Sequence, residues 1–314
     1  MKLNRIFLAL FATIILIACN NDDDGFNHAA QAITDDEDIV SYLKSHYLDM
    51  TDDEIKEIDA DQTPLFDNMV QQKVLKNNIE YSLYYYVEKE GVTINPTPVD
   101  SVLTSYKGTL LDGKTFETAK NPLWFTLNGV ITGWTYGIPH FKGGILQTND
   151  DGTFEYLDKG KGIIVMPSGL AYGNASQPNS IIEANSPLVF QLELHDVNET
   201  DSDNDGILSK FEDVNKDGIY DDDSDNDTFL DYLDGDDDND GVLTKYENVD
   251  PNEDGDPSDA VDTDGDGTPD YLDTDDDGDG TPTADEDADE DKNGNPDDAK
   301  DSDNDGTPDY LDAN

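Results

Sequence analysis

The chain has 314 residues and a formal net charge of −56 at pH 7, with a sequence pI near 4.1. This length is typical of about two domains. The charge excludes nucleic acid as a partner, because phosphate binding needs a basic surface, and it argues against direct adhesion to anionic lipid headgroups.

The charge and the metal-binding residue types are unevenly distributed. Residues 201–314 contain 45 Asp and Glu against 5 Lys, a net −40, whereas the rest of the chain contains 29 acids and 13 bases, a net −16. The single cysteine, Cys19, excludes a disulfide within the chain and a multi-thiol metal site. Four scattered histidines have no ligand spacing and are expected to be surface or packing residues: His28, His46, His140 and His195.

The N-terminus has the pattern of an export signal. Lys2 and Arg5 precede an apolar run over residues 6–18. The run is shorter than the ~20 residues that span a bilayer and is typical of a signal peptide. It ends L-I-A-C at 16–19 and resembles a bacterial lipobox, which implies that residues 1–18 are removed and that Cys19 is lipidated. A plain signal peptide with a chance cysteine, or a buried thiol, is the alternative.

Residues 19–33 are expected to form an acidic tether after the lipidated cysteine. The run N-N-D-D-D-G at 20–25 resembles a signal that sends lipoproteins to the outer face of the outer membrane in some Gram-negative bacteria. The alternative is a simple solvated linker. We therefore expect an exported protein, lipid-anchored to the bacterial outer membrane and exposed at the cell surface if the acidic run acts as that signal.

Residues 34–98 are expected to form a small helical region and a first strand. Thr34, followed by three acidic residues, predicts a helix N-cap, and the helical pattern extends to residue 80 with a break at Pro64. Apolar residues recur at helical spacing: Ile39, Val40, Leu43, Tyr47 and Leu48. A Tyr- and Val-rich strand begins near Ile79 and ends at a turn around Gly91, and its aromatic residues favour sheet core over a ligand site.

From Ser101 the chain has the pattern of short strands separated by turns. The D-G pair at 112–113 predicts a hairpin between two strand-like runs. A second D-G pair, Asp151–Gly152, predicts an additional hairpin within residues 147–160. Further strand-like runs occupy 161–167 and 187–194.

Four motifs in this order resemble the FKBP family of peptidyl-prolyl cis-trans isomerases. They are Y-x-G-x-L-x-D-G-x-x-F from Tyr106, V-I-x-G-W from Val130, L-A-Y-G from Leu170 and L-V-F-x-x-E-L from Leu188. The resemblance covers residues 99–197. It implies an α+β fold, with an antiparallel half-barrel sheet around a short helix that begins near Gly133. It also implies cofactor-independent isomerisation of proline-containing polypeptides.

The same resemblance assigns residues to a substrate pocket. Trp134 would form the floor, and the hydroxyl of Tyr172 and the backbone amide of Ile131 would donate to substrate carbonyls. Glu117 stands where the family usually has Asp. The remaining walls would be Tyr106, Phe116, Leu123, Val130, Ile182 and Phe190, together with the Ile131 side chain.

Such a pocket fits the chemistry that the family performs. Rotation about an X-Pro bond crosses a barrier of ~18–20 kcal/mol, because amide resonance is lost midway. A dry, apolar pocket favours the less polar twisted state without any nucleophile. Leu123 in place of an aromatic residue, Glu117, and Glu183–Ala184 in place of a proline depart from the family pattern. They keep open an alternative, an FKBP-fold binding module with little turnover.

After residue 197 the composition changes to an acidic array, expected to span 198–314. The loop 201–212 has Asp at positions 1, 3 and 5, Gly at 6 and Glu at 12, the pattern of an EF-hand calcium loop. The pattern recurs at 236–247 and 275–286. Two shorter copies, 262–273 and 301–312, have Pro where the second EF-hand helix would begin, and resemble thrombospondin type 3 repeats.

The array is therefore predicted to bind structural Ca²⁺. Degenerate copies lie at 213–221, 223–234, 250–259 and 289–298. The alternative is a disordered polyanion, although alternate-position Asp with a fixed Gly is not a random acidic pattern. The predicted ligands are Asp201, Asp203, Asp205, Glu212, Asp236, Asp238, Asp240, Glu247, Asp262, Asp264, Asp266, Asp275, Asp277, Asp279, Glu286, Asp301, Asp303 and Asp305.

Overall fold

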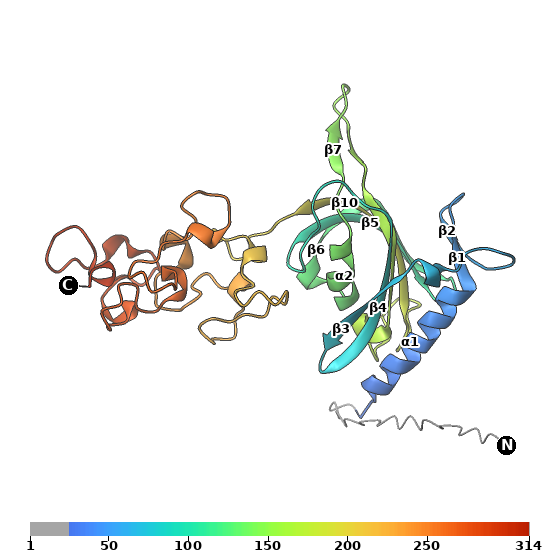
Figure 1. Ribbon diagram of the computed structural model, residues 1–314, viewed down its shortest axis with the longest axis horizontal. Helices are drawn as coiled ribbons and strands as arrows, with labels where there is room; N and C mark the ends of the chain where they lie inside the picture. Colours follow the sequence, from blue (N-terminus) through green and yellow to red (C-terminus); the bar gives the residue numbers. More distant parts are fainter. Residues whose placement is uncertain (1–24, 314) are drawn as a thin grey trace, which may run out of the picture.

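The computed structural model describes residues 25–313, which form a sheet domain and an elongated acidic array (Figure 1). Cys19 and the predicted signal peptide lie outside the described residues. None of the helices in the described part of the chain has the length and apolar character needed to cross a bilayer.

The sheet domain is α+β, and its main sheet is antiparallel throughout. Six strands pair in the order β3-β4-β9-β10-β5-β6, and the pairs β1–β2 and β7–β8 form separate hairpins. The elements are α1 (His28–Ser45), β1 (His46–Asp49), β2 (Glu54–Glu57), β3 (Val70–Lys76), β4 (Ile79–Lys89), β5 (Ser101–Leu110), β6 (Thr115–Thr126), α2 (Thr132–Gly137), β7 (Ile145–Thr148), β8 (Phe154–Leu157), β9 (Gly160–Met166) and β10 (Leu188–Asn198). The predicted antiparallel sheet is confirmed, and it extends back to β3.

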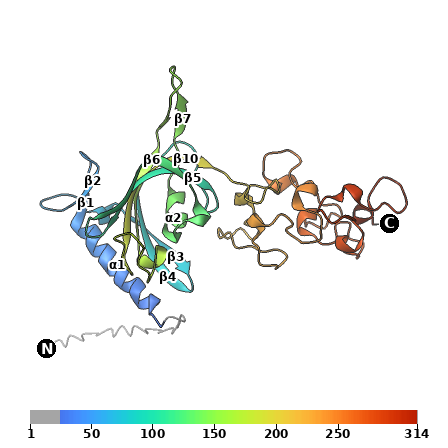
Figure 2. The same ribbon diagram turned by 180° about the vertical axis from the view of Figure 1, so that it is seen from behind.

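The two helices cover opposite faces of the curved sheet (Figures 1 and 2). Successive side chains of a strand point to opposite faces, so alternate residues of the central strands enter two cores. Ile164 and Met166 of β9 pack in the core that contains α2. Ile163 and Val165 pack in the core that contains α1. The short helix α2 lies in the concave side of the sheet, where the predicted pocket residues converge.

Helix α1 differs from the prediction at its start. Asn27, not Thr34, is the N-cap, and its side chain accepts a hydrogen bond of 2.9 Å from the Ala30 amide. Thr34 lies inside the helix and donates to the Ala30 carbonyl. Asp35 is buried and accepts hydrogen bonds from the amide and hydroxyl of Ser168, at 2.8 and 2.6 Å. This acid therefore anchors the helix to the sheet domain instead of opening its first turn.

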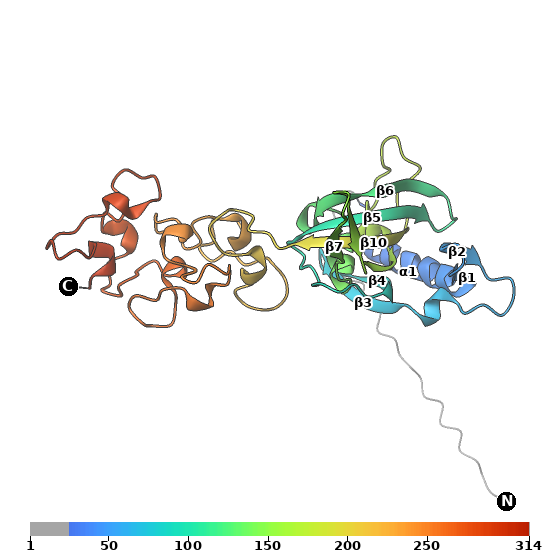
Figure 3. The ribbon, with the colours of Figure 1, turned by 90° about the horizontal axis from the view of Figure 1, so that it is seen from above.

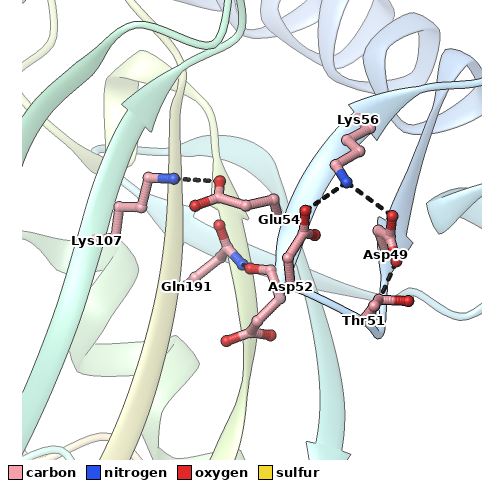
Figure 4. A network of polar contacts seen from close by, with 8 residues as sticks. Asp49, Thr51, Asp52, Glu54, Lys56, Lys107 and Gln191 are labelled. Atoms are coloured by element: carbon pink, nitrogen blue, oxygen red, sulfur yellow. Dashed lines mark hydrogen bonds and ion pairs between the residues drawn. The ribbon is translucent and has the colours of Figure 1, made fainter.

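The predicted continuation of the helix to residue 80 is wrong, because α1 ends at Ser45 and a hairpin follows. The Asp49 carboxylate accepts from the Thr51 amide at 2.9 Å and pairs with Lys56, local bonds that compete with helix formation. Lys107 pairs with Glu54 and thereby joins the hairpin to the sheet (Figure 4). The side chain of Gln191 donates to the Asp53 carbonyl at 2.8 Å. Tertiary contacts thus override the helical pattern.

The additional hairpin predicted around Asp151–Gly152 is present as β7–β8. Gly152 has φ +83°, and the Asp151 carboxylate accepts hydrogen bonds from the amide and hydroxyl of Thr153. The hairpin projects from the sheet domain (Figure 1). Its residues Ile145, Leu146 and Phe154 are exposed.

The acidic array extends away from the sheet domain and contains only short 3₁₀ turns within residues 199–313 (Figure 3). Its nine loops group into three units that begin at residues 201, 236 and 275. The Leu208 amide in the first loop of unit 1 donates to the Gly255 carbonyl in unit 2, at 3.0 Å. The equivalent bond from Leu243 to Gly294 joins units 2 and 3, at 2.9 Å.

Small apolar clusters repeat in the same way between units. Ile207 packs with Val249 and Tyr271, and Val242 packs with Ala288 and Tyr310. The sheet domain joins the array through Thr200, whose amide donates to the buried Asp100 carboxylate at 3.2 Å, and whose hydroxyl donates to the Val99 carbonyl at 2.9 Å. Each unit therefore contacts its neighbours, as in a solenoid.

Candidate functional site

An aromatic cavity of 620 Å³ opens on the concave side of the sheet, next to α2. Eight of the ten predicted pocket residues line it: Tyr106, Phe116, Glu117, Val130, Ile131, Trp134, Tyr172 and Phe190. They come from β5, β6, the start of α2, the segment after β9, and β10. The fold thus gathers residues that are up to 84 positions apart in the chain.

Trp134 is the centre of the aromatic cluster. Its ring lies edge-on to those of Tyr106, Phe125 and Phe190, with centroids 4.9, 5.3 and 5.2 Å away. Edge-to-face pairs of this kind add about 0.5–1.5 kcal/mol each beyond area burial. The indole is 4% exposed, and its N–H has no acceptor among the described residues. The rings fix each other's orientation and provide a flat apolar surface for a ligand.

A glycine allows the cavity wall to close. The Cβ of any larger residue at Gly108 would meet the Phe116 ring at 2.4 Å. Gly108 therefore permits the ring to lie directly over β5, where it contacts Phe190 with centroids 5.6 Å apart.

Hydrogen-bond donors stand at the rim of the aromatic cavity. Burial, followed by the negative charge of Glu117, raises the pKa of the Tyr172 hydroxyl, which therefore keeps its proton as a donor. Burial, followed by the negative charge of Glu117, likewise raises the pKa of Tyr106. The Ile131 amide, at the N-cap of α2, has no acceptor within residues 25–313. The cavity combines an apolar floor with free donors, which suits a carbonyl-bearing, apolar ligand.

Two predicted wall residues do not line the cavity. Three residues of β6, 120–122, lie opposite Ser105 alone, so a bulge interrupts the β5–β6 pairing just before Leu123. Leu123 is 49% exposed and does not line the cavity, so the prediction that it forms a wall is wrong. Phe125 takes that place, with its ring 6.0 Å from that of Tyr106. Ile182 is buried in the core behind the cavity and supports it without lining it.

Lys76 lines the cavity and was not predicted from the sequence. It ends β3, an edge strand, and its ammonium group donates to the Thr132 hydroxyl and to the Gly169 carbonyl, both at 3.0 Å. No motif pointed to it, because its segment was expected to be helical. A strand pattern over residues 70–76 would have placed it beside Ile79 across a two-residue turn.

A separate groove of 230 Å³ lies between the β1–β2 hairpin and the outer face of the sheet. Opposite charges line it and pair with each other, including Lys161 with Asp53 at 2.6 Å and Lys107 with Glu54. These ion pairs, some of which are drawn in Figure 4, attach the hairpin to the sheet. The charged lining of the groove is therefore explained by the attachment of the hairpin to the sheet.

In the array, carboxylates from different loops converge. Asp238, Asp240 and Glu247 of the second unit meet Asp276 of the third, with ligand atoms all within 4.8 Å of one another and every residue buried. Asp205 and Glu212 of the first unit meet Asp237 of the second in the same way. Asp237 and Asp276 occupy the second position of their loops and were not among the predicted ligands.

In each of these two clusters, a backbone amide fixes one carboxylate oxygen by a hydrogen bond, and other carboxylate oxygens have no partner. Asp240 accepts from the Val242 amide at 2.8 Å, and Asp205 accepts from the Ile207 amide at 2.8 Å. The second oxygen of each, and both oxygens of Glu212 and Glu247, have no hydrogen-bond partner among the described residues. Buried carboxylates without partners are costly unless a cation compensates them.

The electrostatics of the clusters favour a cation. Burial, followed by neighbouring carboxylates, raises the pKa of Glu247 to about 11 and that of Asp276 to about 9. The same causes raise the pKa of Glu212 to about 10 and that of Asp237 to about 10. Converging hard oxygen atoms fit Ca²⁺, which takes 6–8 such ligands at 2.3–2.6 Å. Three carboxylates of a single loop can also converge, as Asp262, Asp264 and Asp266 do, but two of these three residues are exposed.

A family model described as FKBP-type peptidyl-prolyl cis-trans isomerase matches residues 92–195. The match contains the aromatic cavity apart from Lys76. Residues 92–195 form an FKBP-type domain.

Curated relatives share this FKBP-type domain and cover only part of the chain. FkpA of Escherichia coli K12, an FKBP-type peptidyl-prolyl cis-trans isomerase, is 42% identical over 118 residues, which are 37% of each protein. The isomerase Mip of Coxiella burnetii is 27% identical over 125 residues, 39% of this chain and 46% of Mip. A crystal structure of E. coli FkpA is 38% identical, with a TM-score of 0.31, and covers 40% of this chain and 51% of the other. The chain thus spans little more than a third of the length of FkpA.

Proposed function

We propose that the protein is a peptidyl-prolyl cis-trans isomerase that acts on exported polypeptides. The aromatic cavity carries this proposal, because a proline ring on Trp134 would leave water while its neighbouring carbonyls meet the donors of Tyr172 and Ile131. Loss of water favours the less polar twisted amide over the planar one. The reaction needs no cofactor in this scheme.

A measurement of isomerisation on short X-Pro peptides tests the proposal. The full chain should accelerate exchange between the cis and trans forms, and Trp134→Ala should abolish the acceleration. A folded wild-type protein that leaves exchange at its uncatalysed rate would refute catalysis and favour the alternative, a binding module. The position of Leu123 outside the cavity, with Phe125 in the wall, removes one departure that favoured this alternative.

We further propose that the array binds Ca²⁺ and is rigidified by it. The support comes from the buried carboxylate oxygens without partners in the clusters around Glu212 and Glu247. A net −40 on residues 201–314 opposes compaction, so the free energy of ion binding becomes free energy of folding.

Small-angle scattering of the full chain tests the calcium proposal. The radius of gyration should fall when millimolar Ca²⁺ replaces chelator, and Mg²⁺ should substitute poorly, because it requires octahedral geometry and loses its water reluctantly. An unchanged radius would mean that the acidic residues act only as a solvated polyanion.

We also propose attachment to the outer membrane through a lipid on Cys19, with the FKBP-type domain and the array outside the cytoplasm. The L-I-A-C sequence at 16–19 supports this placement. A Cys19→Ser variant should fail to incorporate labelled fatty acid and should leave the membrane fraction. Retention of label in that variant would exclude Cys19 as the attachment site.

A further inference from the structure

A second, smaller cavity adjoins the aromatic one. It has a volume of 240 Å³, and it shares Lys76, Ala171 and Tyr172 with the aromatic cavity. Asn77 and Gly169 complete its wall near Lys76. The shared residues form the boundary between the two cavities, so a peptide that ran from one cavity into the other would pass Lys76.

Lys76 is an unusual cation in this protein. It is half-buried, and burial lowers its pKa. Its two acceptors, the Thr132 hydroxyl and the Gly169 carbonyl, are neutral, and within residues 25–313 it makes no ion pair. Lys73, on the same strand, instead pairs with Glu80 at 3.3 Å. An ammonium group has three donors, so Lys76 keeps one for a ligand.

The position of Lys76 is built into the fold. The β3–β4 turn consists of Asn77 and Asn78, with φ of +52° and +59°, the tight turn type that matches strand twist. This turn delivers the lysine to the start of α2 and to the segment after β9. The strand β3 lies before residues 92–195, so the feature is an addition to the FKBP-type domain.

We propose that Lys76 makes the smaller cavity a subsite for a substrate carboxylate, the side chain of an Asp or Glu that flanks the proline. This inference rests on the proposed isomerase function. A partly desolvated cation whose hydrogen-bond partners are neutral is stabilised strongly when an anionic ligand binds to it. The whole chain has a net charge of −56 and repels acidic peptides, so a local cation favours the binding of such a peptide.

Matched peptides test the subsite with the full chain in millimolar Ca²⁺. Each pair carries Glu or Gln at the same position next to the proline, on either side. We expect the wild-type kcat/KM for the better-placed Glu peptide to exceed that for its Gln partner about three- to tenfold at low salt, and the ratio to approach one at high salt.

The variants separate charge from structure. Lys76→Met should lower kcat/KM for the Glu peptide to the value for its Gln partner in the same variant, whereas Lys76→Arg should retain the preference for Glu. Lys73→Met, on the same strand but outside both cavities, should behave like the wild type. Equal kcat/KM for Glu and Gln peptides at every position, or a preference that survives in Lys76→Met, would overturn the subsite.

Failure of the proposed isomerase function has a different signature. If no peptide is isomerised, calorimetric binding of the same Glu and Gln peptides still measures the subsite. Tighter binding of the Glu peptide that is lost in Lys76→Met supports it, and equal affinities overturn it.

Discussion

The link between array units can be tested by the substitution Asp276→Asn. Asp276 is 2% exposed and belongs to unit 3, yet it completes a cluster with Asp238, Asp240 and Glu247 of unit 2. Asparagine keeps the shape of the side chain and the backbone bond from the residue 276 amide to the Thr283 hydroxyl. The substitution therefore removes one charged ligand and little else.

The expected magnitude follows from ligand linkage. A site with a Kd of ~10⁻⁴ M, in ~2 mM Ca²⁺, stabilises the folded array by RT ln(1 + [Ca²⁺]/Kd), about 1.8 kcal/mol. If loss of the charge weakens binding tenfold, this falls to about 0.7 kcal/mol, a loss of about 1.1 kcal/mol per array. In chelator no ion is bound, so the substitution should cause no loss of stability there.

Scanning calorimetry of the full chain in calcium and in chelator measures both effects. Asp285→Asn, an exposed acid of the same loop, is the matched control and should change neither transition. Both tryptophans, Trp124 and Trp134, lie in the sheet domain, so their fluorescence reports whether that domain is unaffected. Destabilisation of equal size in calcium and in chelator would refute a ligand role for Asp276.

Three further substitutions probe other features. Trp134→Ala should lower the free energy of unfolding of the sheet domain by about 3–5 kcal/mol, because it opens a large cavity among three rings. Denaturant titration measures this loss, and a value below about 1 kcal/mol would contradict the packing. Tyr172→Phe should lower kcat/KM about three- to tenfold without changing stability, since one hydrogen bond is worth about 0.5–1.5 kcal/mol, and full activity would exclude the hydroxyl as a donor. Thr228→Gly should raise the stability of the calcium-loaded array by about 1 kcal/mol, because Thr228 has φ +91° where equivalent loop positions have Gly. An unchanged melting temperature would show that no strain is stored at Thr228.

The aromatic cavity could be predicted largely from sequence because its residues lie in ordered motifs. Its errors have local causes. Phe125, not Leu123, lines the cavity beyond a bulge at residues 120–122 of β6, and the sequence motifs did not reveal this bulge. Lys76 was missed because β3 was expected to be helical, and the edge strand forms only through its pairing with β4.

The helical region and the array show the same limit. Apolar spacing correctly indicated α1, but its end at Ser45 depends on bonds from Asp49 and on pairs between the hairpin and the sheet. In the array, loop periodicity identified the carboxylates at alternate positions. It could not reveal that Asp237 and Asp276 reach the preceding unit, because that depends on how the loops stack.

The way β10 enters the array has a mechanical consequence. This strand lies between β9 and β5 in the middle of the sheet, and only Glu199 and Thr200 separate its end from the first acidic loop. Tension applied to the array would therefore pull β10 along its own axis. Ladder bonds in an antiparallel sheet run perpendicular to the strands, so those on both sides of β10 would be sheared together instead of being peeled apart singly. The sheet domain is thus attached to its acidic extension in the geometry that resists extraction best.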